Sequence, residues 1–200
     1  MPQESMKLDL KFRGSRNYIT GADIAQSMLD ANGNCTSIRF EFHHMAACAL
    51  KLREVTNAQL PEIKHREDVH ALMAYLDAGG QQKFMVAEQL YDGDEPQRVE
   101  YDETVYTRGA LIDGDKIHAS MDSLRKNPID AMVALNKYLL NQSIEIHPWI
   151  FVRLDLSKWP LDFNHTYLKF TVNRSHGIFR SEVFNSDQLV GNIYFSKRSP

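Results

Sequence analysis

An alternation of apolar and polar residues near the start of the chain predicts a strand, with a helix directly after it. In residues 6–13, MKLDLKFR, every second side chain is apolar, which is typical of a half-buried strand. Thr20 then stands where a helix N-cap is expected, an apolar stripe follows, and Asn32-Gly33 is a stop signal. We therefore expect a helix of about three turns over residues 20–31.

The remainder of the first half reads as three strands and a second helix. Residues 35–46, CTSIRFEFHHMA, and 47–55, ACALKLREV, are rich in strand-forming residues. Over residues 65–78 the apolar positions recur at helical spacing, and Gly79-Gly80 closes the segment, which predicts a helix there. The strand KFMVAEQLYD follows.

The second half contains one long apolar helix among strands. Strands are expected around ETVYTRGALI and DKIHASM, joined by the hairpin signal Asp113-Gly114. Pro128 then opens an apolar helix that includes residues 130–141. Further strands are expected at WIFVRLDL, HTYLKFTVN, GIFRSEVFN and LVGNIYFSK, and the junction of the halves at residues 92–98, DGDEPQR.

The two halves carry similar patterns in the same order, which predicts an internal repeat. The helix over 20–31 and the strand after it superpose on the helix over 130–141 and its following strand, which places Ala25 on Asn136. Chance similarity of two common patterns is the alternative.

A second pair of matches lies farther along each half. The LKL at 50–52 matches the LKF at 168–170, and Glu88 matches Glu182. The first half has more residues between its two matches than the second half has. We interpret the surplus as an insertion, namely the helix expected over 65–78.

Composition and charge narrow the class of protein. The 200 residues are 43% hydrophobic and 24% charged, which is enough to bury a core. A formal net charge of −3 with interspersed signs argues against nucleic acid as a partner. Because no apolar run has the length of a spanning helix or the form of a signal peptide, we expect a cytoplasmic protein with no membrane partner. Cys35 and Cys48 are expected to be reduced.

The segment FRSEVFNSDQLVGN at 179–192 resembles the closing strands of hotdog thioesterases and dehydratases, where a charged strand turns at Asp and returns apolar. The order of a strand, a long helix and an antiparallel meander is similar to the same fold. The predicted fold class is therefore α+β, with two hotdog-like units, each an antiparallel sheet wrapped around a central helix. The units are expected over 1–95, with the helix near 65–78 inserted, and over 96–200.

This resemblance implies an acyl-thioester ligand, held between the two halves near the starts of the central helices. Hydrolysis is favoured over dehydration, because FRGSRNYITGADI at 12–24 lacks the histidine of the dehydratase loop. An acyl-CoA or acyl-carrier-protein thioesterase without cofactor or metal is the leading hypothesis, as a monomer or as a homodimer of double-hotdog chains. The alternative is a non-catalytic module that binds a small apolar ligand or a protein partner.

The candidate catalytic residues include two acids and one histidine. Asp23 and Asp130 match the acid that many thioesterases of this fold carry in the central helix. Both lie in a first helical turn, where an acid is also stabilised electrostatically, so capping is the alternative role. His43 is a candidate base oriented by Asp23 or Glu54, or else a hydrogen-bonded structural histidine. His44 follows it on the opposite strand face, which argues against a shared metal.

Asn136 is the fourth candidate, because it interrupts an apolar helix face. A buried amide there needs a hydrogen-bond partner, either a backbone group or a ligand carbonyl or water. The residues expected to bind substrate lie at the two helix starts: Arg16, Tyr18, Thr20 and Asn127. Arg16 and the helix start suit a phosphate or carboxylate, although a glycine-containing turn before a helix is common.

Overall fold

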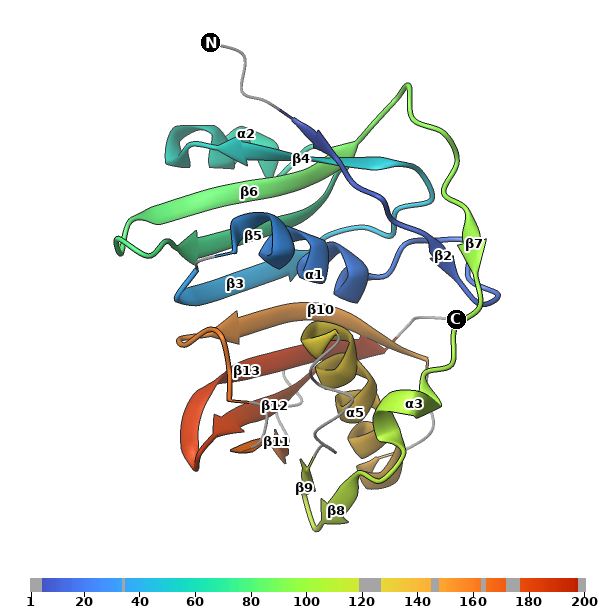
Figure 1. The fold of residues 1–200 in the computed structure, drawn as a ribbon, viewed down its shortest axis with the longest axis vertical. Helices are drawn as coiled ribbons and strands as arrows, with labels where there is room; N and C mark the ends of the chain where they lie inside the picture. The colour runs from blue at the N-terminus through green and yellow to red at the C-terminus, as the bar shows by residue number, and fades with distance from the viewer. Residues whose placement is uncertain are drawn as a thin grey trace. The chain divides into compact units, whose positions relative to one another are not determined.

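A computed structural model describes residues 5–33, 35–118, 127–144, 148–162, 165–171 and 177–197. The chain divides into two compact units, Met1–Tyr101 and Asp102–Pro200. Each unit pairs an antiparallel sheet with one long helix (Figure 1).

Unit 1 begins with short strands and then alternates helical and extended segments. Its elements are β1 (Met6–Lys7), β2 (Phe12–Arg13), α1 (Gly21–Asn32), β3 (Ser37–Phe42), β4 (Leu50–Val55), η1 (Asn57–Gln59), α2 (Leu60–Ile63), β5 (Val69–Leu76), β6 (Gln82–Gln89) and β7 (Arg98–Val99). The main sheet has the order β1-β4-β6-β5-β3, and β2 pairs with β7 in a separate parallel ribbon. The continuous strand expected over 6–13 is wrong, since only its two ends pair with other strands.

A crossover connection shapes the sheet of unit 1. Both β4 and β5 are antiparallel to β6, which lies between them, so β4 and β5 run in the same direction. Two neighbouring antiparallel strands can be joined by a tight turn, but strands that run the same way need a longer connection across the sheet. Here the connection is formed by residues 56–68, which contain η1 and α2.

One face of this sheet is covered by α1. The helix packs against β5 and β6, and the Asn32 amide donates to the sulfur of Met85 at 3.5 Å. Met73 lies opposite Met85 across the β5–β6 pair, so their side chains share this face. The helix is closed by Gly33, whose φ of 36° suits a residue without Cβ.

The opposite face of the same sheet is covered by the crossover. Val69, Leu72 and Val86 form a buried cluster with Val55 and Ile63, and partly buried Leu60 and Phe84 pack against it. The strand β5 is therefore buried on both faces. The helix predicted over 65–78 is wrong, because a strand without a solvent face loses its alternation and its apolar residues can fall at helical spacing by chance.

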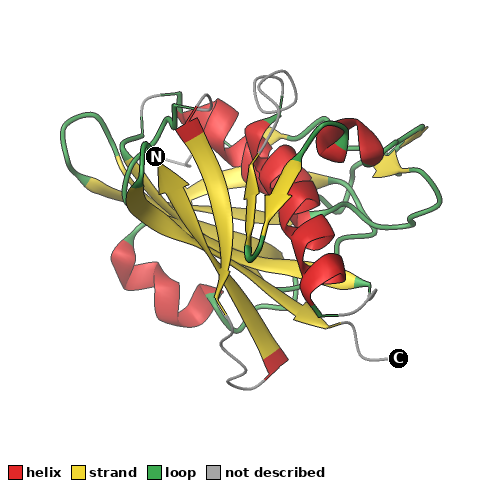
Figure 2. Cartoon of the chain, turned by 90° about the horizontal axis from the view of Figure 1, so that it is seen from below, coloured by secondary structure: helices red, strands yellow, loops and turns green. Residues whose placement is uncertain are grey.

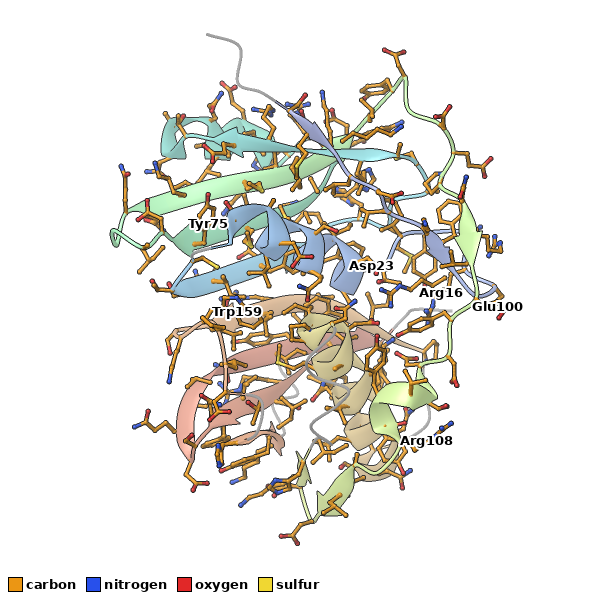
Figure 3. The ribbon with its side chains drawn as sticks, in the orientation of Figure 1. Arg16, Asp23, Tyr75, Glu100, Arg108 and Trp159 are labelled. Carbon is orange, nitrogen blue, oxygen red and sulfur yellow. The ribbon has the colours of Figure 1, made fainter. Side chains whose placement is uncertain are left out.

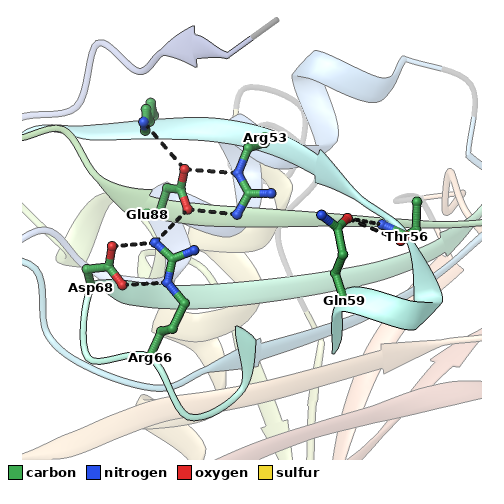
Figure 4. Close-up of polar contacts among 7 residues, drawn as sticks. Arg53, Thr56, Gln59, Arg66, Asp68 and Glu88 are labelled. Atoms are coloured by element: carbon green, nitrogen blue, oxygen red, sulfur yellow. Dashed lines mark hydrogen bonds and ion pairs between the residues drawn. The ribbon is translucent and has the colours of Figure 1, made fainter. Parts of the chain in front are cut away.

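A charge network fastens the end of the crossover to the sheet (Figure 4). Arg53 donates to both carboxylate oxygens of Glu88 at 3.0 Å. Lys51 and Arg66 each lie 3.4 Å from the same carboxylate, and Arg66 also donates to Asp68 at 2.9 and 2.6 Å. Burial of Glu88 by itself raises its pKa, but the arginine bonds and surrounding cations more than offset this, so the net pKa lies below its usual value.

Unit 2 consists of a short helical turn, a hairpin, the long helix and four longer strands. Its elements are α3 (Thr104–Thr107), β8 (Leu111–Asp113), β9 (Lys116–His118), α5 (Pro128–Ser143), β10 (Trp149–Leu156), β11 (Thr166–Thr171), β12 (Ile178–Asn185) and β13 (Gln188–Lys197). The sheet has the order β10-β13-β12-β11-β9-β8. The hairpin expected at Asp113-Gly114 joins β8 and β9, whereas the first part of ETVYTRGALI forms α3 rather than a strand.

Contacts at the end of α5 hold the helix on its sheet. The Trp149 indole N–H donates to Asn141 at 2.8 Å, and the ring packs edge-on against Phe179 at 4.8 Å. The helix lies against β9 and β11. Helices are red and strands are yellow in Figure 2. The turn of the closing hairpin uses Ser186 and Asp187, both at positive φ, as a two-residue hairpin of the mirror-image type requires.

The two sheets have the same spatial plan but a different chain order. Lys51 lies opposite Glu88 in unit 1, and Lys169 lies opposite Glu182 in unit 2. Thus β6 occupies in its sheet the place that β12 occupies in its own, although β6 is the last long strand of its unit and β12 precedes β13. The unequal spacing of the sequence matches comes from this exchange of strand order, and the inserted helix at 65–78 is not its cause.

Both units thus have the hotdog architecture, in which an antiparallel sheet packs against a central helix, and the predicted α+β fold class is confirmed. The helices expected over 20–31 and 130–141 are α1 and α5. Both are buried along most of their length. No helix in the described ranges is long and apolar enough to cross a membrane.

Replacing Gly191 tests the pairing of β10 with β13. A Cβ on Gly191 would collide with the backbone carbonyl oxygen of Asp155 in the neighbouring strand. We expect Gly191→Ala to lower the free energy of unfolding by about 1–3 kcal/mol, the usual cost of overpacking, as measured by urea denaturation. The adjacent Asn192→Ala adds no atoms and is the control. Equal stability of the two variants would contradict the register.

Glu88→Gln should be strongly destabilising, because it leaves three cations around an uncharged amide. Breaking a buried pair costs about 3–5 kcal/mol, whereas Glu182→Gln, whose Arg180 partner is 3.9 Å away, should cost about 1 kcal/mol or less. Because the folded state lowers the pKa of Glu88 below 4.5, its contribution is present above that pH and is lost on acidification. Urea midpoints between about pH 3 and pH 7 should therefore vary less in Glu88→Gln than in the unsubstituted chain.

Candidate functional site

The start of α1 brings together two of the predicted site residues, Thr20 and Asp23. Thr20 is the N-cap, and its hydroxyl accepts from the backbone N–H of Asp23 at 3.2 Å and donates to the Asp23 carboxylate at 2.7 Å. The carboxylate also forms an ion pair with Arg13. Asp23 is buried, and these contacts support the capping role, the alternative to catalysis.

A cluster of arginines surrounds Tyr101 beside this helix start. The guanidinium carbons of Arg13 and Arg16 lie 4.6 and 5.2 Å from the centre of the Tyr101 ring. Arg98 donates to the carbonyl oxygens of Gly14 and Arg16 at 2.6 Å each. Arg16 and Asp23 are labelled near the start of α1 in Figure 3. The pairing of β2 with β7 brings Arg98 and Tyr101, which the sequence analysis did not single out, to this turn.

Tyr18 and His43 also lie in unit 1, in chain segments next to the start of α1. Tyr18 is half-buried just before the helix. Ile19 forms an isolated antiparallel bridge with Ala46, with its N–H 2.7 Å from the Ala46 carbonyl, so the segment that carries His43 is anchored to the residues before α1. Burial lowers the pKa of His43, and the nearby Glu41 carboxylate offsets part of this effect.

A bulge in β5 buries His70 beside Cys48. The register between β5 and β6 shifts between Val69 and Ala71, which leaves His70 as the extra residue. Its Nδ1 lies 3.3 Å from the His44 carbonyl oxygen and its Nε2 lies 3.9 Å from the Cys48 sulfur. Since a carbonyl only accepts hydrogen bonds, this assigns the proton to Nδ1 and leaves Nε2 to accept weakly from the thiol.

Burial sets the protonation states of this group. It lowers the pKa of His70 below 6.5, and the hydrogen bond to the His44 carbonyl offsets this only in part. It also lowers the pKa of His43, where Glu41 offsets part of the effect and His44 and Lys64 add to it. Burial raises the pKa of the Cys48 thiol. A neutral histidine beside a protonated thiol is a structural pair and lacks the thiolate of a nucleophilic cysteine.

The start of α5 in unit 2 joins Asn127 and Asp130. Asn127 is the N-cap, and its side-chain oxygen accepts from the Asp130 backbone N–H at 3.3 Å. Pro128 occupies the first helical turn, where its missing N–H has no cost. Asp130 is buried, with 3% exposure.

Asn136 lies in the middle of α5 and is fully buried, with 0% exposure. Neither its Nδ2 nor its Oδ1 has a hydrogen-bond partner among the residues that the structure describes. Asn185 of the same unit shows the usual arrangement, since its Nδ2 donates to Asp162 O at 2.6 Å and to Thr166 Oγ1 at 3.0 Å. The backbone partner that was one of the two alternatives for Asn136 is therefore not found in the described part of the chain.

The predicted site residues thus fall into two groups, one in each unit. Unit 1 assembles Arg16, Thr20 and Asp23, with Tyr18 and His43 nearby in the chain segments around Ile19. Unit 2 holds Asn127, Asp130 and Asn136 on one helix. An open groove of about 490 Å³, lined by residues 7–11, Ala49 and residues 94–97, contains none of them. Within the described ranges no group of three or more His, Cys, Asp and Glu side chains could hold a metal ion.

Comparisons with known proteins concern the fold. No protein-family model matches the sequence, and no curated protein matches it significantly. Among solved structures, an acyl-ACP thioesterase from Bacteroides thetaiotaomicron is similar at 12% identity, over 98% of this chain and 97% of that chain, with a TM-score of 0.44. The dehydratase domain of PpsC from Mycobacterium tuberculosis, in complex with C12:1-CoA, is similar at 10% identity, over 90% and 85% of the two chains, with a TM-score of 0.46. A hotdog-fold protein of unknown function from Alicyclobacillus acidocaldarius is similar at 11% identity, over 98% and 93%, with a TM-score of 0.45.

Protonation of His70 and His43 should destabilise the protein. Because the folded state lowers the pKa of His70 and His43 below 6.5, the unfolded chain takes up protons that the folded chain does not. Stability should be full above about pH 6.5 and should decline as the pH falls below it, as measured by urea denaturation. His70→Gln should reduce this decline, while the same substitution at the exposed His165 should leave it unchanged. If stability declines equally with pH in both variants, the loss of stability on acidification does not come from His70.

Proposed function

We propose that this chain handles acyl thioesters as a thioesterase-like hydrolase, and that the reacting group is held by α5 of unit 2. The observation that carries the proposal is the amide of Asn136, which is fully buried and has no partner among the described residues. An unpaired amide costs about 1–3 kcal/mol. Buried polar groups without partners concentrate where a ligand or water completes the bonding.

The chemistry of α5 supports hydrolysis of a neutral carbonyl compound. Asp130 and Asn136 are six residues apart, which is a rise of about 9 Å along the helix and about 120° around it. A water molecule and a thioester carbonyl placed end to end, running obliquely across the helix, span such a distance. In this arrangement Asp130 accepts a proton from the water, and the Asn136 Nδ2 donates to the carbonyl oxygen, whose negative charge grows as the water attacks. The carbon–sulfur bond then breaks, and the proton passes to the departing sulfur to give an acid and a thiol.

Unit 1 is a weaker candidate for the reacting group. Its only helix acid of the predicted set, Asp23, is already held by Arg13 and by the Thr20 hydroxyl. An aspartate that is paired with a guanidinium is a poor proton acceptor, since the pair favours its ionised form in place. Its position supports a role in fixing the start of α1.

One observation favours the second candidate function, a non-catalytic module that binds a small apolar ligand or a protein partner. Both predicted acids, Asp23 and Asp130, lie in first helical turns beside an N-cap. If both serve only the helix ends, the buried amide would bind a carbonyl without any base to activate water. The two candidates then differ in turnover but share ligand binding.

An assay of hydrolysis over a panel from acetyl-CoA to dodecanoyl-CoA, with thiol release as the readout, distinguishes the two candidate functions. For the hydrolase we expect turnover that Asp130→Asn lowers by about 10²–10⁴-fold, the usual contribution of a general base. Asp23→Asn is the matched control and should keep turnover while losing stability through the Arg13 pair. A melting-temperature rise with dodecanoyl-CoA but no thiol release would favour the binding module. If the panel gives neither thiol release nor a rise in melting temperature, acyl thioesters are rejected as ligands.

A further inference from the structure

Two polar side chains of unit 2 are fully buried without a hydrogen-bond partner among the described residues. Within the part of the chain that the structure describes, buried side-chain nitrogen or oxygen atoms lack hydrogen-bond partners only in Asn136, Ser181 and Arg180. Asn136 and Ser181 are both 0% exposed. Arg180 differs, because its side chain is 33% exposed and lies 3.9 Å from Glu182.

Ser181 points to the helix side of its sheet. Burial along β12 alternates, with Phe179, Ser181 and Val183 buried and the residues between them partly exposed. Phe179 packs against Trp149, whose indole is bonded to Asn141 of α5, so this is the face that meets the helix. The Ser181 hydroxyl therefore enters the layer between α5 and the sheet.

The equivalent positions in unit 1 lie on facing surfaces of the helix and the strand. Asn32 at the end of α1 touches Met85 of β6. Ala25 lies seven residues earlier, two turns back on the same side of the helix, and Ala87 lies two residues beyond Met85 on the same face of the strand. The start of α1 and the end of β6 lie at the same end of the unit, because Leu90, directly after β6, is bonded to Ala49 and Ile19, just before α1, is bridged to Ala46. Going back along α1 therefore corresponds to going forward along β6.

The helix and strand matches assign the equivalent positions in unit 2, where α5 lies against β9 and β11 and β11 is the neighbour of β12. α1 and α5 correspond from their C-terminal ends, where Asn32 matches Ser143, and α5 is longer by one turn at its start. Ala25 then corresponds to Asn136. Glu88 and Glu182 face equivalent lysines, so the preceding residues, Ala87 and Ser181, correspond as well. Two buried alanines in unit 1 are thus replaced by two buried polar residues in unit 2.

We propose that Asn136 and Ser181 form one polar site in the helix–sheet layer of unit 2, which receives an uncharged group that accepts and donates hydrogen bonds. The Asn136 amide donates through its NH2 group and accepts at its oxygen, and the Ser181 hydroxyl can both donate and accept. No lysine or arginine is among the fully buried side chains of the described ranges, so a carboxylate or phosphate here would lack a counter-charge. Unit 1, with Ala25 and Ala87, has no such site, and the pair of units is functionally asymmetric.

The identity of the bound group rests on the proposed function, whereas the pairing of the two side chains does not. For a thioester substrate, Ser181 would be a positioning residue that holds the carbonyl or the attacking water against Asn136. Its hydroxyl approaches from the strand side, opposite the helix. This gives the site two walls, one from α5 and one from β12.

The first test uses the ligand-free, full-length protein and the variants Asn136→Ala, Ser181→Ala and their combination. Ser181→Ala removes an unpaired hydroxyl with little change of volume, so we expect the melting temperature to rise by about 2–4 °C. In a shared site the effect of Asn136→Ala must differ between the unsubstituted chain and the chain that already carries Ser181→Ala, whereas independent sites give additive effects. Additive effects, or a lower melting temperature for Ser181→Ala, would overturn the proposal.

The second test adds dodecanoyl-CoA as the probe, with free CoA as the reference. We expect the stabilisation by dodecanoyl-CoA to exceed that by CoA and to be lost in both single alanine variants. Ala87→Ser, the matched change in unit 1, should lower the melting temperature and leave the response to dodecanoyl-CoA unchanged. Coupled alanine variants without any dodecanoyl-CoA response would uphold the polar site and reject the proposed substrate class. A response that survives both alanine substitutions would place acyl binding elsewhere and remove Ser181 from it.

Discussion

The strand β5 of unit 1 is covered on both faces, and this double covering constrains the rest of that unit. β4 and β5 run in the same direction with β6 between them, so the chain has to cross the sheet between the two. The crossing segment leaves the face that α1 already covers and buries the other one. Arg66 and Asp68 at its end are bonded to each other, and Arg66 also reaches the buried Glu88, so the crossover is held by charge as well as by apolar contact.

The sequence predicted the central helices well but not the strand order. Caps, periodicity and stop signals are local, and α1 and α5 begin and end close to where these signals lie. A strand that is buried on both faces has no alternation, so the segment 65–78 was predicted as a helix. The match of Glu88 with Glu182 identified equivalent positions correctly, yet spacing along the chain cannot tell an inserted element from two exchanged strands.

The candidate site was predictable only where a residue broke its local pattern. Asn136 interrupts an apolar helix face, which is visible in the sequence. Ser181 gives no such signal, since a serine in an alternating strand is ordinary until its burial and missing partner are known. His70 was hidden by the wrong helix, and Arg98 acts through carbonyl groups more than eighty residues away in the chain, which no local pattern contains.

The exchanged order of strands also affects how each unit can assemble from the unfolded chain. In unit 2, β11, β12 and β13 pair with their immediate neighbours in sequence, so the sheet can grow by successive hairpins with small losses of chain entropy. In unit 1, β4 pairs with β6, and its end residue Val55 lies directly opposite Phe84. Between β4 and β6 in the sequence comes β5, so the loop that this pairing closes contains a whole strand. The β5–β6 hairpin has to form before β4 has an edge to join, and closing that larger loop makes the addition of β4 a late and slow event. Until then the edge of β6 is open, and the newly synthesised first unit is the part of the chain most exposed to pairing with the wrong strand.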